Sequence, residues 1–395
     1  MMTPCDVLIV GAGPAGSVAG IVLARAGARV RIVDRATFPR DKLCGDTVNP
    51  GTLARLQSLG LAAGLDDKSL RVDGMRVTGE SGVAIEGRYP GGLSGRAITR
   101  RELDWLLLEQ AIAAGCQFDP GVAVRRAIVT EGSGVRSVSG AVIGAEGRES
   151  PIAARVTIAA DGRHSTIGFG LGLARHPPSP RRWAIGAYYE NFMPRKGSDP
   201  SGSDTSGSDT FGEMHVRGGY YIGVAPVPGG LTNVCLVKPS GAGDPGLADP
   251  AALLTRALAR DPLLRDRAAG ARLTGPPVVL GPLAVDVRDA SIDGLLLAGD
   301  AAGFIDPMTG DGLRFATHGG ELAAAAALQA LADGWSGVHA RLSAQRQHAF
   351  GGKWRFNRAL RGLVASPRLV DAAALGAHLS PGILHAVIAR AGDCS

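Results

Sequence analysis

Several kinds of sequence feature are missing from this chain of 395 residues. Its five cysteines lie far apart, with no C-x-x-C pair and no histidine-rich ligand spacing, which argues against a disulfide scaffold and a metal site. Reduced thiols of this kind are typical of a cytoplasmic protein. No run of 18 apolar residues occurs, which excludes a membrane-spanning helix, and the apolar N-terminus lacks the basic segment of a signal peptide.

Acidic residues are missing from one long stretch near the C-terminus. The formal net charge of +6 is mild for this length and indicates no nucleic-acid partner. Between Asp333 and Asp371 there is no Asp or Glu. The basic residues there are Arg341, Arg346, Lys353, Arg355, Arg358, Arg361 and Arg368. Interleaved with apolar residues, they suit peripheral contact with a lipid headgroup layer, an acyl carrier protein or an anionic substrate, and they are also typical of a solvated helix face.

The features that are present begin with a buried strand and a glycine-rich turn. The apolar run 7–10 predicts a parallel strand, and Gly11, Gly13 and Gly16 form a G-x-G-x-x-G turn that opens a helix. Gly11 allows the tight turn, Gly13 lets the backbone approach a pyrophosphate, and Gly16 lets the helix pack closely on the strand. The helix N-terminus then faces the phosphates.

A second strand strengthens this interpretation. Residues 29–33 predict a strand that ends at Asp34, within roughly 20 residues of the glycines, where a carboxylate can bind a ribose diol. The sequence therefore predicts a dinucleotide-binding unit.

The rest of the chain alternates between two kinds of sheet. Short strands with glycine turns between 70 and 98 indicate an excursion into a second, antiparallel sheet, joined later by strands at 183–192 and 220–237. Strands at 122–130, 135–143 and 156–160 return to the nucleotide sheet. A Gly/Ser/Asp pentapeptide repeat at 197–211 predicts a surface loop.

Three of the predicted buried strands end in polar turns, at Gly11 to Gly16, at Asp161-Gly162 and at Gly299-Asp300. The carboxyl ends of parallel strands line one crevice, so these turns can bind one extended ligand from both ends. With these three motifs in this order, the sequence resembles the flavoproteins of the p-hydroxybenzoate hydroxylase fold over nearly its whole length.

The resemblance implies a fold, a division into domains and a cofactor. The expected class is α/β, a Rossmann-type FAD-binding domain with an inserted antiparallel-sheet substrate domain and C-terminal helices. The expected parts are a discontinuous FAD-binding domain (1–65, 99–177 and 291–335), a substrate domain (66–98 and 178–290) and a C-terminal helical region (336–395). The residues implied to bind FAD are Gly11, Gly13, Pro14, Ala15, Gly16, Asp34, Arg35, Cys44, Gly45, Arg100, Val124, Asp161, Gly299, Asp300, Pro307, Gly310, Asp311 and Gly312.

The roles implied for these residues run along the cofactor. The glycines hold the pyrophosphate, Asp34 the adenosine ribose, Arg100 the ADP part and Asp300 the ribityl chain. The segment 309–312 meets the pyrimidine edge at a helix N-terminus, whose positive end favours anionic reduced flavin. Asp161 is read either as a cofactor residue or as a turn carboxylate.

Two segments point to different chemistry. Phe38 to Asp46 resembles the F-P-R-x-K-x-C-G loop of geranylgeranyl reductases, whereas that branch's Y-x-W-x-F-P motif appears as Tyr221 to Pro226 with both central aromatics replaced by Gly and Ala. Loss of these two aromatic side chains predicts a pocket wider than that of the geranylgeranyl reductases, which would fit a bulkier or planar apolar substrate. The catalytic candidates are Cys44, Gly45, Asp46 and Tyr221. His164 and His215 are weaker candidates for a general base.

Other absences restrict the function further. The W-x-W-x-I-P motif of flavin-dependent halogenases is missing, which disfavours halogenation, and there is no second G-x-G-x-x-G, so NAD(P)H is expected only as a transient electron donor. The first hypothesis is an NAD(P)H-driven monooxygenase that hydroxylates an apolar aromatic or polyketide-like substrate through a flavin C4a-hydroperoxide. The alternative is a geranylgeranyl reductase-like C=C reductase. A remote third is a protein that binds FAD without catalysis.

Overall fold

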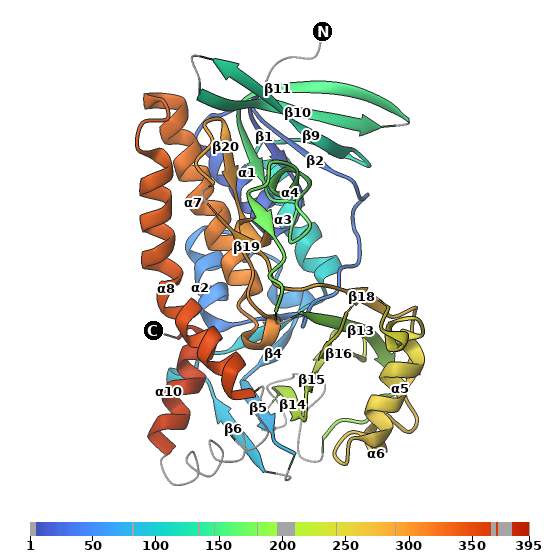
Figure 1. Ribbon diagram of the computed structural model, residues 1–395. Helices are drawn as coiled ribbons and strands as arrows, with labels where there is room; N and C mark the ends of the chain where they lie inside the picture. Colours follow the sequence, from blue (N-terminus) through green and yellow to red (C-terminus); the bar gives the residue numbers. More distant parts are fainter. Residues whose placement is uncertain are drawn as a thin grey trace.

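The computed structural model describes residues 5–80, 83–132, 135–145, 147–179, 181–195, 210–241, 243–288, 290–364, 369 and 381–394. Most of the pentapeptide repeat, and Arg368 of the basic stretch, lie outside these ranges. The expected α/β architecture is confirmed, with a nucleotide-binding sheet, a second sheet and helices near the C-terminus (Figure 1).

The first sheet is built on the strands that flank the glycine turn. In spatial order its strands are β8 (Gln117–Pro120), β2 (Val30–Asp34), β1 (Cys5–Val10), β11 (Arg148–Ala159), β10 (Val135–Ala145) and β9 (Ala123–Gly132), with β20 (Leu295–Leu297) beside β11. The strands β8, β2, β1, β11 and β20 are parallel neighbours, and β9 to β11 form an antiparallel meander. β1, β11 and β20 therefore deliver the three motif turns to one edge, as their parallel pairing requires.

Helices cover this sheet and share its core. They are α1 (Pro14–Arg25), α2 (Pro50–Ser58), α3 (Arg100–Ala113), α4 (Thr166–Gly170) and α7 (Gly312–Asp333). Alanine- and glycine-rich faces let α1 and α7 pack closely, since a Cβ on Gly320 of α7 would lie 2.3 Å from the carbonyl oxygen of Ala15. This contact brings the N-terminus of α7 to the glycine turn.

The second sheet lies below the first in Figure 1. Its strands run in the order β17 (Arg272–Leu273), β13 (Arg182–Glu190), β16 (Leu231–Pro239), β15 (Tyr220–Val227), β14 (Phe211–Arg217), β5 (Gly74–Thr78) and β6 (Ala84–Arg88), with β18 (Val278–Leu280) beside β13. One pair departs from the expected antiparallel pattern, because β14 and β5 are parallel. They come from the two separate excursions of the chain into this sheet, so no tight turn joins them.

Smaller elements complete the fold. Two small sheets are formed by β3 (Thr47–Val48), β7 (Gly95–Ala97) and β4 (Leu70–Val72), and by β12 (Ala174–Arg175) and β19 (Asp286–Val287). Helices α5 (Pro250–Arg260) and α6 (Arg265–Ala268) pack beside the second sheet. Short 3₁₀ turns are η1 (Asp66–Lys68), η2 (Pro90–Gly92), η3 (Pro245–Leu247), η4 (Gly299–Ala302) and η5 (Pro307–Thr309).

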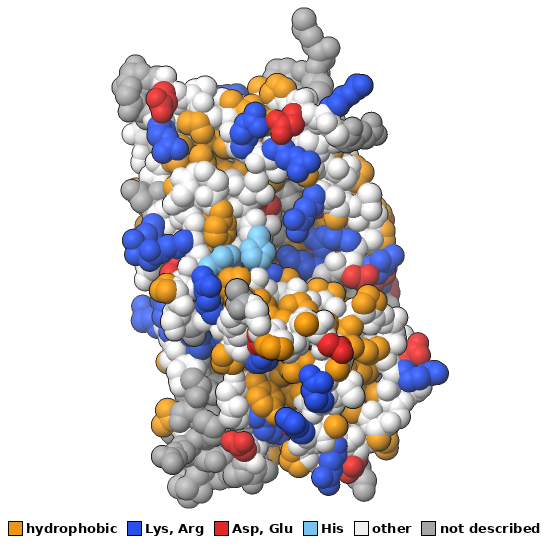
Figure 2. Space-filling model, turned by 45° about the vertical axis from the view of Figure 1, so that its right-hand side comes forward, with side chains coloured by type: hydrophobic (Ala, Val, Ile, Leu, Met, Phe, Trp, Pro, Cys, Tyr) orange, Lys and Arg blue, Asp and Glu red, His pale blue; other side chains and the backbone are white. Residues whose placement is uncertain are grey.

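The C-terminal helices connect the two sheets. α8 (Val338–Val364) runs beside α7, and α10 (Pro381–Gly392) lies against β5 and β6 of the second sheet (Figure 1). No helix within the described residues is both long and apolar enough to span a membrane. On the face shown in Figure 2, hydrophobic side chains gather over the lower part of the molecule.

Candidate functional site

A large cavity lies between the two sheets, with an empty volume of about 2060 Å³ that includes the part open to solvent. Its lining includes residues of both sheets, so one ligand can contact both of them there. The lining on the side of the first sheet includes Gly13, Pro14, Ala15, Lys42, Cys44, Gly45, Arg100, Gly162, Arg163, Gly299, Asp300, Pro307, Gly310 and Gly312. The structure thus brings together turns that lie almost 300 residues apart.

The glycine turn is shaped by close backbone contacts. Gly11 has a φ of +101°, and a Cβ there would lie 2.5 Å from the carbonyl oxygen of Ala160. A Cβ on Gly16 would lie 1.9 Å from the carbonyl oxygen of Gly11, so any side chain there would force α1 away. At Gly13 the nearest atom to a Cβ would be Arg40 Nη2 at 3.7 Å. The space beside Gly13 is therefore open, as a pyrophosphate requires.

Asp34 stands at the end of β2 and is oriented by two backbone groups. Its Oδ2 accepts a hydrogen bond from the Ala12 N–H at 2.8 Å, and its Oδ1 accepts one from the Ala36 N–H at 2.8 Å. Beside it Arg35 is exposed, and Val124 on β9 is half-buried. None of Asp34, Arg35 and Val124 lines the cavity.

Arg100 turns inward from the start of α3. Its Nε and Nη2 donate to the Asp104 carboxylate at 2.6 and 2.8 Å, and Arg40 pairs with the same carboxylate at 2.9 Å. Burial raises the pKa of the Cys44 thiol, and the charge of the nearby Arg100 opposes that rise. Lys42, which lines the cavity nearby, has a pKa lowered by burial and by the Arg100 charge. Arg40, Lys42 and Arg100 form a group of cations that suits an anionic ligand. The inward orientation of Arg100 brings its guanidinium near Cys44.

The second and third motif turns differ in what their carboxylates do. Asp300 lines the cavity, and its charge acts on the buried Lys42 and Arg163 nearby. Asp161 does not line the cavity, and its Oδ2 accepts from the Thr166 N–H at 2.7 Å, at the start of α4. Burial raises the pKa of Asp161. The arrangement matches the turn-carboxylate reading of Asp161 and places Asp300 at the cavity lining.

Asp311 faces away from the cavity, although its neighbours Gly310 and Gly312 line it. Its carboxylate pairs with Lys353 Nζ at 2.9 Å and accepts from Asn49 at 3.3 Å and from Asn357 at 3.1 Å. The Lys353 ammonium also donates to the backbone carbonyl of Ala391 in α10 at 3.0 Å. Asp311 therefore anchors the C-terminal helices beside the N-terminus of α7.

The second sheet presents one face to the cavity, in the alternation that the pleat imposes. The residues on this face are Ala184 on β13, Asn233, Cys235 and Val237 on β16, Tyr221, Gly223 and Ala225 on β15, Gly212 and Met214 on β14, and Met75 and Val77 on β5. A Cβ on Gly223 would have the Cys235 carbonyl oxygen as its nearest neighbour, at 3.8 Å. The small residues thus leave an apolar trough opposite Cys44.

Tyr221 is a buried anchor for the loop that leads into α7. Its hydroxyl donates to Asp306 Oδ1 at 2.9 Å, and Arg182 Nη1 donates to Asp306 Oδ2 at 3.3 Å. Tyr221 is 4% exposed, and Arg182 lies over its ring. These bonds tie two strands of the second sheet to the loop beside the cavity.

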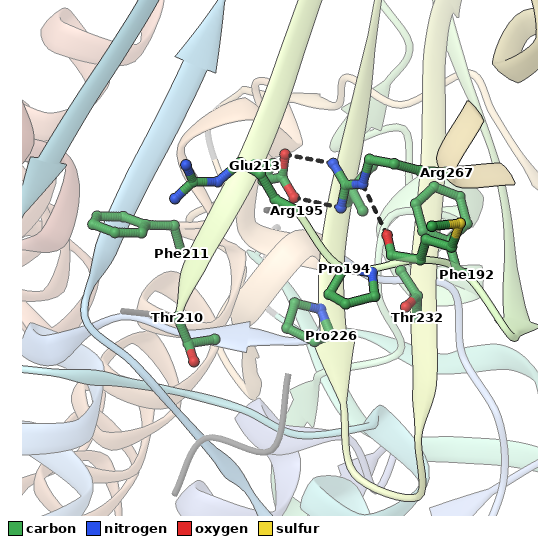
Figure 3. A pocket seen from close by; sticks show the side chains of 11 residues that line it. Phe192, Pro194, Arg195, Thr210, Phe211, Glu213, Pro226, Thr232 and Arg267 are labelled. Carbon is green, nitrogen blue, oxygen red and sulfur yellow. Dashed lines mark hydrogen bonds and ion pairs between the residues drawn. The ribbon is translucent and has the colours of Figure 1, made fainter. Parts of the chain in front are cut away.

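The residues of the expected motif 221–226 do not all line the same cavity. Pro226 lines a smaller hollow with Phe192 and Thr232, outside the large cavity (Figure 3). In this hollow Arg267 holds the Glu213 carboxylate with two hydrogen bonds of 2.9 and 2.8 Å. The motif therefore does not act as one continuous wall of the substrate pocket.

Sequence reasoning missed two residues that hold Asp46. Asp46 is 0% exposed, and its Oδ2 accepts from the Tyr188 hydroxyl at 2.6 Å and from Asn233 Nδ2 at 2.5 Å. No motif marks Tyr188 or Asn233. The only signal is their place on the cavity-side face of β13 and β16, where the two residues pair directly across the sheet.

Both candidate histidines lie outside the cavity lining. His215 is buried, with Nδ1 2.9 Å from the Thr78 hydroxyl and Nε2 3.3 Å from Glu213. His164 packs edge-on against His176, and burial lowers its pKa. Neither ring reaches the cavity.

The basic stretch is split between inward and outward side chains. Lys353 is buried, and Arg346 donates to the carbonyl oxygen of Leu297, whereas Arg355 and Arg358 are exposed. All five cysteines are free thiols. No cluster of three or more metal-ligating side chains occurs among the described residues.

Comparison with known proteins extends this picture. A family model described as an FAD binding domain matches residues 4–188. The chain is 33% identical over 331 residues to a menaquinone reductase of Mycolicibacterium smegmatis, covering 82% of this chain and 76% of the relative. It is 31% identical over 331 residues to digeranylgeranylglycerophospholipid reductase 2 of Methanopyrus kandleri, covering 82% and 77%.

The protein belongs to this family of FAD-dependent oxidoreductases. Among solved structures, a flavin-dependent brominase superposes with a TM-score of 0.83 over 99% of this chain and 94% of that chain, at 22% identity. That likeness concerns the p-hydroxybenzoate hydroxylase-type fold alone.

The residues of the cavity fit FAD. The open space at Gly13 suits the pyrophosphate, and Asp300 brings a carboxylate to the cavity lining. Gly310 and Gly312 expose backbone at the N-terminus of α7. FAD supplies hydride or electron transfer at this position, while the chain supplies binding, orientation and protons.

Proposed function

We propose that this protein is an FAD-dependent reductase that saturates a carbon–carbon double bond in an extended apolar substrate of the isoprenoid type. One observation carries the proposal: Cys44 lines the cavity between the FAD-binding turns and the apolar trough of the second sheet. The two relatives, a menaquinone reductase and a digeranylgeranylglycerophospholipid reductase, support the same class of reaction.

Saturation of a C=C bond needs a hydride and a proton. Reduced FAD supplies the hydride. Burial raises the pKa of the Cys44 thiol, although the Arg100 charge opposes this, so the group is a protonated thiol at neutral pH. A thiol held at the edge of an apolar trough can act as the general acid that protonates the second carbon. Cys44 is therefore the proposed catalytic residue.

The trough sets the expected shape of the substrate. Gly223 and Ala225 leave space where an aromatic pair would narrow the cavity, and Met214 and Val77 continue the apolar surface across the sheet. An uncharged chain or fused ring would be desolvated along this face. NAD(P)H is the proposed source of electrons, bound transiently.

Oxygen insertion is the second candidate function, and the width of the trough at Gly223 favours it, because a planar aromatic substrate would fit there. The two functions differ in whether O₂ is consumed and in the mass that the substrate gains.

The test uses FAD-loaded protein reduced anaerobically with dithionite and mixed with a geranylgeranyl lipid, followed by mass spectrometry of the lipid. We expect a gain of two hydrogens per double bond without O₂. Products that carry one added oxygen, formed only with O₂ and NAD(P)H, would instead identify a monooxygenase and overturn the proposal.

A matched pair of variants tests the general acid. Because general acid catalysis contributes about 10²–10⁴-fold, C44A should slow reduction by about 100-fold or more while FAD stays bound. C235A removes the other thiol that lines the cavity and should leave the rate within about threefold, since no proton is assigned to it. Equal losses in both variants would contradict the role of Cys44.

A further inference from the structure

Asp46 occupies an unusual position behind Cys44. Its φ is +51°, in the left-handed region that few residues other than glycine adopt, and its carboxyl group is fully buried. Burial raises the pKa of the Cys44 thiol, and the charge of the nearby Asp46 carboxylate raises it further. The Asn233 amide donates both to Asp46 Oδ2 at 2.5 Å and to the Cys44 carbonyl oxygen at 2.8 Å. Such a conformation persists where surrounding bonds over-determine it, as these do.

The charged and titratable groups around Asp46 come from three other elements. They are Arg100 on α3, Tyr188 on β13 and Cys235 on β16, with Cys44 on its own loop. Burial raises the pKa of Asp46 to about 6, although the hydrogen bonds from Tyr188 and Asn233 lower it. Near neutral pH this carboxyl group can therefore both hold and release a proton. Its Oδ1 has no hydrogen-bond partner within the described residues, which leaves it able to take one.

Tyr188 connects this buried group with the outside. Its hydroxyl is 2.6 Å from Asp46 Oδ2, while its side chain is only half-buried. A tyrosine hydroxyl both donates and accepts, so it can pass a proton inward as it receives another from water. Asp46 itself does not line the cavity and so does not touch the substrate.

We propose that Asp46 returns to Cys44 the proton that the thiol gives up in each turnover, and that Tyr188 links Asp46 to solvent. The inference rests on the proposed function of Cys44 as the general acid. In the reduction step the S–H bond breaks as a C–H bond forms on the carbon next to the one that received hydride. The thiolate then takes the proton of the Asp46 carboxylic acid, and the carboxylate regains a proton from water through the Tyr188 hydroxyl. Reduced FAD is the only reductant.

The first test needs no substrate. The holoenzyme is alkylated with iodoacetamide at several pH values, and each cysteine peptide is quantified by mass spectrometry. At pH 8 Asp46 is ionised, and its charge raises the pKa of Cys44. D46N should therefore speed Cys44 alkylation about three- to tenfold, since one pKa unit is tenfold in thiolate, with Cys235 as the internal reference. An unchanged Cys44 rate would overturn the coupling, whatever reaction the enzyme catalyses.

The second test separates the relay from a structural role. Cys44 starts protonated, so D46N and Y188F should keep the wild-type rate of the first turnover with prereduced enzyme. Their steady-state kcat should fall about tenfold or more with KM unchanged, because reprotonation becomes slow. A slower first turnover, or an unchanged kcat, would overturn the proposal.

Y189F is the matched control. Tyr189 is the next residue of β13, points to the opposite face and has a buried hydroxyl without a partner in the described structure. Loss of the Tyr189 hydroxyl should change neither the rate of the first turnover nor the steady-state kcat. If the wild-type protein reduces no alkene, the proposed function fails while the alkylation result still decides whether Asp46 and Cys44 are coupled.

Discussion

Gly13 and Gly16 lie three residues apart and have different structural roles. Gly16 lets α1 pack on the turn, since its Cβ would overlap the Gly11 carbonyl oxygen, whereas Gly13 keeps space beside Arg40 open. One is needed by the fold and the other by the ligand. The same division holds for the carboxylates, where Asp161 bonds the start of α4 and Asp300 lines the cavity.

This difference predicts contrasting effects of two alanine substitutions. G16A should lower the free energy of unfolding of the apoprotein by at least about 1–3 kcal/mol, the usual cost of overpacking, and FAD binding should be lost with the fold. G13A should leave apoprotein stability within about 0.5 kcal/mol while weakening FAD binding, because the new methyl group stands in the pyrophosphate space. Urea unfolding and titration of flavin fluorescence measure the two effects. Equal stability of G16A and G13A would contradict the assignment of Gly16 to the fold and of Gly13 to the ligand.

Individual roles were predictable from the sequence where backbone geometry alone decides them. The positions of Gly11, Gly13 and Gly16 follow from the spacing of one local turn. The inward orientation of Arg100 does not, because it depends on Asp104 and on Cys44, which reaches it from a different loop. Tyr188 and Asn233 carry no motif and gain their role only when β13 and β16 pair.

At the scale of elements, an interior strand of the second sheet, β14, is held by charges as well as by strand pairing. Arg267 in α6 holds Glu213 of β14 with two hydrogen bonds, and His215 lies beside the same carboxylate (Figure 3). Burial alone would raise the pKa of Glu213, but the hydrogen bonds from His215 and Arg267 outweigh it and lower the pKa to about 2.

The lowered pKa of Glu213 makes its interaction with Arg267 sensitive to acid. A carboxylate whose pKa is lower when folded stabilises the protein above its unfolded pKa, and this stability disappears as the pH falls toward about 2. E213Q should cost about 2–3 kcal/mol at pH 7, at about 1.4 kcal/mol per pKa unit, and almost nothing near pH 2. Urea unfolding between pH 2 and pH 7 checks this. D266N, in an exposed pair of the same helix, should change little at any pH.

On the scale of the whole molecule, the C-terminal helices close the space between the two sheets. Leu360 of α8 and Val387, Ile388 and Ala391 of α10 line the cavity. Lys353 joins these helices to Asp311 beside the flavin site, with both side chains 1% exposed. The C-terminal region is thus part of the site, and much of its basic character on α8 faces inward.

Removal of the buried Lys353 ammonium should therefore lower the stability of the whole molecule. K353M leaves the Asp311 carboxylate buried without its ion-pair partner and should lower the free energy of unfolding by about 3–5 kcal/mol. R355M changes an exposed residue two positions along the same helix and should cost less than about 0.5 kcal/mol. Thermal unfolding with flavin fluorescence as a second readout measures both. A small effect of K353M would show that α10 is held by other contacts.

The sequence by itself determined the class of the fold and the cofactor, because the glycine turn, the Asp161-Gly162 turn and the Gly299-Asp300 turn are short segments whose geometry is local. It also determined that one sheet edge must collect them, since parallel strands end together. Only the tertiary structure decided what surrounds the flavin site. Cys44, Asp46, Tyr188 and Asn233 meet because the loop that follows β2 packs on two strands of the second sheet. Lys353 reaches Asp311 because α8 packs on α7. Such contacts depend on how whole elements pack, which no spacing within a single segment encodes.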